Sequence, residues 1–211
     1  MNRAGTEFGA MLECAPTAVL EGHQEATLAT GERFELAIES LLAGLDYVRA
    51  APRDEGRLEL IACRPAVDER IEVEGAELDI QGGMVGDSWS TRGTSPNPKA
   101  QVTVMSARAA AVIAVDRSRW ALAGDQLYVD LDLSPGNVPP GTRLSIGAAV
   151  LEVTDQPHLG CAKFTSRFGA AARELVNSPD GLALNLRGIN TRVVEGGAVR
   201  RGDVVRKLSR A

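Results

Sequence analysis

The 211-residue sequence predicts a mainly β protein with a few helices, folded as an irregular antiparallel β-barrel-like sheet and preceded by an N-terminal helix. Two observations predict this class. Short runs in which apolar and polar residues alternate recur along most of the chain, and Gly, Pro, Asp and Asn separate them. Few helical segments connect these runs, which argues against the many crossover helices of a doubly wound parallel sheet.

The N-terminal extension, residues 1–54, contains the first predicted helix, over residues 31–51. Its apolar side chains fall at helical spacing and form one stripe, and Pro52 ends the helix. An exposed stripe of this size would be an unusually large apolar patch, so we expect it to pack on the barrel or on a second subunit. The stripe consists of Phe34, Ile38, Leu41, Leu42, Leu45 and Val48.

The predicted β domain covers residues 55–209. Two further helices are expected inside it, near residues 107–115 and 166–176, and Asn177-Ser178-Pro179 ends the second one. The alternating runs that predict strands lie at residues 58–60, 71–73, 101–105, 127–131, 144–146, 149–154, 189–194 and 204–208.

Composition excludes several classes of protein. The longest uninterrupted apolar run is seven residues, 109–115, whereas a membrane span needs about 20. Aromatic residues make up 4% of the chain, so no platform for stacking bases is evident. The three Cys are an odd number, which argues against a disulfide scaffold, and no secretory signal is recognisable. We therefore expect a cytoplasmic protein with no membrane and no nucleic-acid partner.

The net charge of −5 is unevenly distributed along the chain. Residues 156–211 hold ten cations and four anions, which gives +6 there and leaves −11 over residues 1–155. A basic end on an acidic chain indicates a site for a small anionic ligand or for a local anionic surface, and not general nucleic-acid binding. The alternative is that these cations are solvated surface residues that pair with the acidic part of the chain.

Common motifs for catalysis and cofactor binding are missing from the sequence. It has no GxGxxG after a strand, no Walker-type phosphate loop, no GxSxG elbow, and no paired CxxC or HExxH spacing. The only histidines are His23 and His158, and neither lies beside a recognisable nucleophile motif for serine-triad chemistry.

The segment 156–164, Gln-Pro-His-Leu-Gly-Cys-Ala-Lys-Phe, is the strongest candidate site. Cys161 follows a predicted strand, with Lys163 two residues after it and His158 three residues before it. A nearby cation lowers the pKa of a thiol, and the thiolate is the form that attacks electrophiles or binds metal. The alternative is a buried Cys that acts as a small hydrophobe, which is also what we expect of Cys63 in its alternating strand. His158 fits a base, a proton shuttle or an ordinary surface residue.

Several segments, taken together and in order, resemble the MOSC domain family, which is named after the C-terminal domain of molybdenum cofactor sulfurases. The similarity spans about residues 55–209; each motif is weak alone, and the ordered set is fairly specific. It rests on the Gly83-Met84-Val85-Gly86-Asp87 turn, residues 101–105, 125–133 with Asn137, 146–148, 153–154, Cys161-Ala162-Lys163-Phe164, 186–193, Gly197 and 199–205.

The resemblance implies a barrel-like fold, in agreement with the alternating pattern, and implies that Cys161 is the functional cysteine. In family members studied as enzymes, the corresponding thiolate ligates molybdenum of a pyranopterin dithiolene cofactor and supports reduction of N-hydroxylated compounds. We therefore expect a small-molecule oxidoreductase that receives electrons from a separate protein. The alternatives are a non-catalytic carrier of cofactor or sulfur, using a Cys161 thiolate or persulfide, and a family member that has kept the barrel and lost the metal.

The predicted site has Cys161 as metal ligand and catalytic residue, together with His158. The expected cofactor-binding residues are Lys163, Arg187, Asn190, Arg192, Gly86, Asp87 and Arg92.

Some of these assignments have structural alternatives. Gly86-Asp87 also fits a tight turn, Arg187 a surface loop, and Asn190 a strand bend whose backbone groups it satisfies. The family often has a basic residue and then His after this Gly-Asp; here Ser88-Trp89 follow, and Arg92 is the next cation. Pyridoxal phosphate belongs to a separate domain of full-length sulfurases and is not expected. The oligomeric state is expected to be monomer or dimer.

Overall fold

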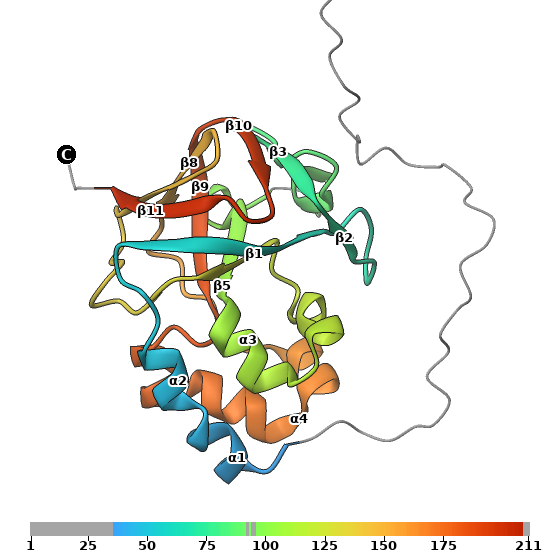
Figure 1. Cartoon of the computed structure of the whole chain (residues 1–211). Coiled ribbons are helices and arrows are strands. Elements are labelled where there is room, and N and C mark those ends of the chain that lie inside the picture. The colour runs from blue at the N-terminus through green and yellow to red at the C-terminus, as the bar shows by residue number, and fades with distance from the viewer. Residues whose placement is uncertain (1–35, 92, 94–95, 209–211) are drawn as a thin grey trace, which may run out of the picture.

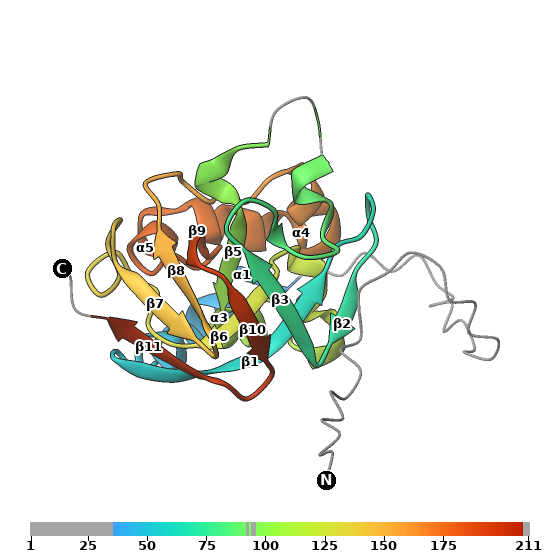
Figure 2. The same ribbon diagram turned by 90° about the horizontal axis from the view of Figure 1, so that it is seen from above.

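The computed structural model describes residues 36–91, 93 and 96–208. Strands form one half of the molecule and helices the other, with the small sheet that carries β10 and β3 at the far side of the barrel from the helices (Figures 1 and 2). No helix of the described part is both long and apolar enough to cross a bilayer.

A closed barrel of seven strands forms the centre of the described structure. The strand order is β11-β7-β8-β9-β5-β6-β1, and β1 pairs with β11 to close the ring, while β2 (Ile71–Val73) extends β1 outside it. This confirms the predicted barrel-like class. The barrel strands are β1 (Glu55–Cys63), β5 (Val102–Ser106), β6 (Leu127–Asp130), β7 (Arg143–Ile146), β8 (Ala149–Val153), β9 (Ile189–Glu195) and β11 (Val204–Leu208).

One pair of barrel strands differs from the predicted antiparallel arrangement. β5 and β6 are parallel, and the other neighbouring strands of the barrel are antiparallel. Parallel neighbours need a crossover connection. Helix α3 (Ala107–Ala114) and the 3₁₀ helix η3 (Arg117–Ala123) supply it between β5 and β6.

A second, three-stranded sheet was not predicted from the sequence. It consists of β10 (Gly197–Arg200), β3 (Gly75–Asp79) and β4 (Gly83–Met84) in that order. These strands have two to five residues, and glycines occur in each, so they carry little alternation for a sequence pattern to detect.

The barrel strands bury side chains on both faces. In β1, Leu58, Ile61 and Cys63 point into the barrel core, whereas Leu60 and Ala62 join a second core under the helices. A register shift between Leu58 and Leu60 marks a β-bulge in this strand. Cys63 is buried, as the alternating pattern predicted.

The helix predicted over residues 31–51 appears as two short helices, α1 (Ile38–Ala43) and α2 (Leu45–Arg49). They meet at Gly44, where a Cβ would lie 2.6 Å from the side chain of Val112 on α3. A glycine there lets the junction of α1 and α2 approach α3 closely. The start of the predicted helix, including Phe34, lies outside the described residues.

The described part of the apolar stripe packs inside this chain, except for Leu42, which is exposed. Leu41, Leu45 and Val48 are buried in the second core, which also contains Tyr128 of β6 and Phe168 of α4 (Ala162–Asn177). The stripe therefore lies between the outer face of the barrel and the other helices. This matches the first of the two expected packing partners.

The other two predicted helices are present with altered bounds. α3 covers residues 107–114, and α4 begins four residues earlier than predicted, so Cys161 caps its N-terminus. Gly169 interrupts α4 with a positive φ of 88°. α4 ends at Asn177, and a helix not foreseen, α5 (Pro179–Ala183), follows. The 3₁₀ helices η1 (Ser88–Thr91) and η2 (Pro98–Ala100) were also not foreseen.

Replacing Leu41 by Ala should lower the free energy of unfolding by about 2–5 kcal/mol, because this side chain is fully buried. The matched control is Leu42→Ala on the same helix, whose side chain is 44% exposed and whose loss should cost about 0.5 kcal/mol or less. Urea denaturation of both variants measures the difference. Equal effects would mean that α1 is not docked as described.

Candidate functional site

Cys161 is exposed and lies at the N-terminus of α4. Burial raises the pKa of its thiol, but hydrogen bonds from the backbone N–H groups of Phe164 and Lys163, together with the charge of Arg187, outweigh this effect. The pKa is therefore lowered from its ordinary value. This environment favours a thiolate that incoming molecules can reach, unlike the buried Cys63.

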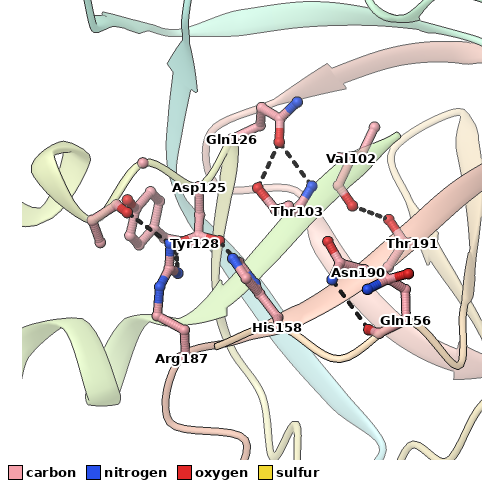
Figure 3. Close-up of polar contacts among 12 residues, drawn as sticks. Val102, Thr103, Asp125, Gln126, Tyr128, Gln156, His158, Arg187, Asn190 and Thr191 are labelled. Carbon is pink, nitrogen blue, oxygen red and sulfur yellow. Dashed lines mark hydrogen bonds and ion pairs between the residues drawn. The ribbon is translucent and has the colours of Figure 1, made fainter. Parts of the chain in front are cut away.

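His158 lies on the loop between β8 and α4, and its imidazole points toward Asp125 (Figure 3). Its Nδ1 is 3.5 Å from Oδ1 of Asp125, and 14% of its side chain is exposed. Burial, and next the charge of Arg187, lower the pKa of His158 to about 4, although Asp125 acts in the opposite direction. The imidazole is therefore neutral at pH 7.

Arg187 is buried, so the alternative of a surface loop residue is wrong. Its Nη1 donates to Oδ2 of Asp125, its Nη2 donates to the carbonyl oxygen of Ala123 at 2.8 Å, and its guanidinium lies 5.2 Å from the ring centroid of Phe164. These contacts hold the guanidinium inside the protein. Its charge acts on Cys161 and His158 through space.

Gly188, next to Arg187, makes a close backbone approach within the fold. Its φ is +100°, and a Cβ would lie 2.4 Å from the carbonyl oxygen of Val104 on β5. The missing side chain thus lets β9 start beside β5.

Asn190 supports the loop that carries His158. Its Nδ2 donates to the carbonyl oxygens of Gln156 at 3.1 Å and Pro157 at 3.2 Å (Figure 3). The structure therefore places Asn190 as a residue that satisfies backbone groups, the alternative considered for it.

Asp87 and Gly86 form a turn, and Asp87 also holds a buried arginine. Its carboxylate accepts hydrogen bonds from Arg64 Nε at 2.8 Å, Arg64 Nη2 at 3.0 Å and the backbone N–H of Trp89 at 2.9 Å. Gly86 has a φ of +82°, which suits the turn. Asp87 is thus engaged by Arg64.

Two further residues that were predicted to bind the cofactor are Arg192 and Arg92. No contact of the described residues brings either of them to Cys161. Arg192 is exposed on β9, and its Nη2 lies 2.6 Å from Oε1 of Glu152 on the neighbouring strand β8. Arg92 lies outside the described residues.

A cationic pocket lies along the first turns of α4, the helix that Cys161 caps. It is open, has a volume of about 530 Å³, and is lined by Asp68, Arg70, Leu122, Lys163, Ser166 and Arg167. Its three cations face a single carboxylate, so positive charge is in excess. Lys163 was predicted, whereas the contributions of Arg70 and Arg167 were missed. Arg70 comes from a polar loop with no sequence signal for a site.

Two of the three cations in this cationic pocket pair with Asp68, whereas Arg70 forms no ion pair with it in the described part of the chain. Oδ1 of Asp68 lies 3.0 Å from Nζ of Lys163 and 2.9 Å from Nη2 of Arg167. Arg70 Nε is buried and, among the described residues, has no hydrogen-bond partner. Burial, and next the charges of Arg167 and Arg64, lower the pKa of Arg70. An anion in the pocket would relieve this repulsion.

Most of the C-terminal cations pair with acidic residues from the first part of the chain. Among the described residues these are Lys163, Arg167, Arg187, Arg192, Arg201, Arg206 and Lys207. For most of this segment, the positive charge in the sequence is therefore explained by pairing with the acidic part of the chain and not by a ligand site. In the cationic pocket, by contrast, three cations face the one carboxylate of Asp68.

Cys161 offers a single thiolate, which fits a metal whose other ligands come from the cofactor that carries it. No group of three or more His, Cys, Asp or Glu side chains suited to a metal ion exists within residues 36–91, 93 and 96–208. A single exposed thiolate next to a cationic pocket fits a group with a metal–sulfur head and an anionic tail.

Comparison with known proteins gives a family and a fold. The family model described as the MOSC domain matches residues 97–206. A solved structure described only as a hypothetical protein is 20% identical, with a TM-score of 0.55 over 78% of this chain and 72% of that one. No curated protein matches the chain.

Two further solved structures have lower TM-scores. The YuaD protein from Bacillus subtilis is 18% identical, with a TM-score of 0.49 over 72% of this chain and 94% of that chain. YiiM from Escherichia coli is 21% identical, with a TM-score of 0.49 over 74% of this chain and 71% of that one.

Alkylation should distinguish the cysteines. In a Cys14→Ser background, we expect Cys161 to react with iodoacetamide while Cys63 stays protected, because only Cys161 is exposed. The lowered pKa of Cys161 should shift the midpoint of its rate–pH profile below that of a free thiol at about 8.5. Mass spectrometry at each pH follows both sites. Faster reaction at Cys63, or an unshifted Cys161 profile, would contradict this assignment.

Proposed function

Because the chain belongs to the MOSC domain family, which is associated with molybdenum cofactor binding, we propose that it binds this cofactor at Cys161 and reduces small N-hydroxylated or related substrates. The observation that carries the proposal is the placement of an exposed cysteine with a lowered pKa at the head of α4, next to the cationic pocket. The first turns of α4 thus present a soft metal ligand and two of the three cations for a phosphate.

In this proposal the two ends of the cofactor use different residues. The Cys161 thiolate is a soft donor suited to molybdenum. Lys163, Arg70 and Arg167 would hold the phosphate through their positive charges. Arg187 acts from inside the protein by stabilising the thiolate. When bound, the cofactor supplies two-electron reduction chemistry at the metal.

In this proposal Cys161 and His158 control the ionisation of the metal ligand and the transfer of protons near the cofactor. The surroundings of Cys161 lower the pKa of its thiol, which favours the thiolate form that binds a metal. His158 is neutral at pH 7, so it serves as a hydrogen-bond acceptor or proton relay and not as a stored proton. The sequence has no recognisable flavin, haem, iron–sulfur or nicotinamide motif, so we propose a separate electron-transfer protein as reductant.

The proposed domain boundary is wider than the family match. The match begins at residue 97, whereas β1, which closes the barrel with β11, begins at Glu55. We propose that the functional domain spans residues 55–209 and that residues 1–54 are an extension whose helices cover the barrel. A free, reactive thiol suits a reducing compartment, so the proposed site of action is the cytoplasm.

The exposure of Cys161 also favours a second candidate function. A thiol at the protein surface can pass a bound cofactor, or sulfur held as a persulfide, to another protein. This carrier would use the same cysteine without turning over a substrate.

Molybdenum analysis of protein produced in a cofactor-competent host tests both candidates. We expect near-stoichiometric metal in the wild type and a much lower metal content in Cys161→Ser, while Cys63→Ser keeps the wild-type content. Turnover of an N-hydroxylated substrate with a reduced dye as electron donor supports the reductase. Retained metal without turnover supports the carrier, and a wild type without molybdenum contradicts both forms of cofactor binding.

Charge reversal at Lys163 should weaken cofactor retention. A hydrogen bond from a charged donor contributes about 1.5–3 kcal/mol, so Lys163→Glu should lower affinity by roughly ten- to a hundredfold. Lys99→Glu is the matched control, because both side chains are similarly exposed, at 59% and 57%, and each pairs with one Asp. Removing the competing carboxylate in Asp68→Asn should instead strengthen retention. Equal losses for the two lysine variants would place the phosphate elsewhere.

A further inference from the structure

The carboxylate of Asp125 is fully buried and faces two partners. Its Oδ2 accepts the hydrogen bond from Arg187 described above. Its Oδ1 and the Nδ1 of His158 lie 3.5 Å apart, and neither atom has a hydrogen-bond partner among the described residues. Figure 3 shows Arg187 and His158 both pointing at this carboxylate.

The free-energy cost of burying Oδ1 of Asp125 opposite Nδ1 of His158 depends on which ring nitrogen of the histidine carries the proton. An unsatisfied buried group costs about 1–3 kcal/mol. With a proton on Nδ1 of His158, the imidazole presents a donor to Oδ1 of Asp125, and both atoms are satisfied. With the proton on Nε2 instead, a nitrogen lone pair faces a carboxylate oxygen, and both atoms stay unsatisfied.

The doubly protonated imidazolium is disfavoured in this place. Arg187 already neutralises Asp125, and the charges of Arg187 and Arg64 both act against a further cation. The side chain of His158 is also mostly buried. Of the three protonation states, the neutral form with Nδ1–H is the one that the surroundings favour.

The surrounding contacts fix the geometry of this group. Asn190 holds the carbonyl oxygens of the two residues before His158. Arg187 packs on the ring of Phe164, whose backbone N–H contacts the Cys161 thiol. The buried carboxylate is thus connected both to the histidine loop and to the first turn of α4.

We infer that Asp125 is a positioning residue that holds His158 as the Nδ1–H tautomer and leaves its Nε2 as the hydrogen-bond acceptor of the Cys161 site. Because Nδ1 is buried against Asp125, the exposed part of the ring lies away from that nitrogen. The Nε2 lone pair is then available to accept a proton or a hydrogen bond from a molecule bound at Cys161. This catalytic meaning rests on the proposed function, whereas the tautomer itself does not.

Nitrogen-15 NMR of the imidazole in metal-free protein tests the inference. His23 is the only other histidine, so a His23→Ala background leaves a single imidazole signal. At pH 7 we expect a protonated, pyrrole-type Nδ1 and an unprotonated, pyridine-type Nε2. The reverse assignment, or shifts averaged between the two tautomers, would overturn the inference without any variant at Asp125.

Asp125→Asn, in the same background, tests whether the carboxylate sets the tautomer. An amide can turn its N–H toward Nδ1, so we expect the proton to move to Nε2. The control is Asp87→Asn, which also disrupts a buried carboxylate–arginine pair but at a carboxylate bonded to Arg64 and not to Arg187. It should leave the Nδ1–H signature unchanged. A tautomer unchanged in folded Asp125→Asn would contradict the role of Asp125.

These outcomes are separable from the proposed function. Molybdenum retention is measured on loaded protein and the tautomer on metal-free protein, so a wild type without molybdenum and with Nδ1–H would reject cofactor binding alone. A wild type that retains molybdenum when loaded, but shows Nε2–H in its metal-free form, would reject the positioning role alone. If Asp125→Asn fails to fold, the wild-type spectrum still decides.

Discussion

The buried ion pair between Arg187 and Asp125 connects the barrel to the segment that carries Cys161. Asp125 lies shortly before β6 and Arg187 shortly before β9, so the pair joins two barrel strands that are far apart in sequence. Arg187 also packs on Phe164 in the first turn of α4. Breaking such a pair by removing one partner typically costs about 3–5 kcal/mol, because the other charge is left buried.

The same pair sets the electrostatics of the site. The charge of Arg187 lowers the pKa of both the Cys161 thiol and the His158 imidazole. It therefore favours a thiolate beside a neutral histidine at pH 7. Because Arg187 is fixed inside the protein, its charge lowers these pKa values whether or not a ligand is bound. The cations of the cationic pocket remain available to an anion. The separation of these two tasks gives the site its proposed organisation.

The barrel and the principal candidate residue were predictable from the sequence because both have local signals. Alternating side chains revealed the barrel strands, and the Cys161 segment stood out by its loop residues and neighbouring Lys163. The small sheet was missed because its strands, such as β4 with two residues, are too short for a pattern. The start of α4 was misplaced because its N-cap residue, Cys161, is not one of the residue types that usually mark a helix start in a sequence.

The positions of the arginines could not be predicted, because they depend on contacts between distant segments. Arg187 is buried only because Asp125 lies opposite, 62 positions away in the chain. Arg70 enters the cationic pocket from the loop between β1 and β2, and no local pattern marks it. The charge asymmetry of the sequence was real, but most of its cations were matched by the acidic part of the chain. Only three-dimensional proximity distinguishes the cationic pocket from those paired residues.

X-ray absorption at the molybdenum edge is the most direct measurement of the central claim, that Cys161 is a ligand of the metal. It counts the sulfur atoms bound to molybdenum in cofactor-loaded protein. The account predicts that the wild type has one more sulfur ligand than the dithiolene pair of the cofactor, and that Cys161→Ser, loaded under the same conditions, loses that ligand. Identical sulfur coordination in the two proteins would contradict it.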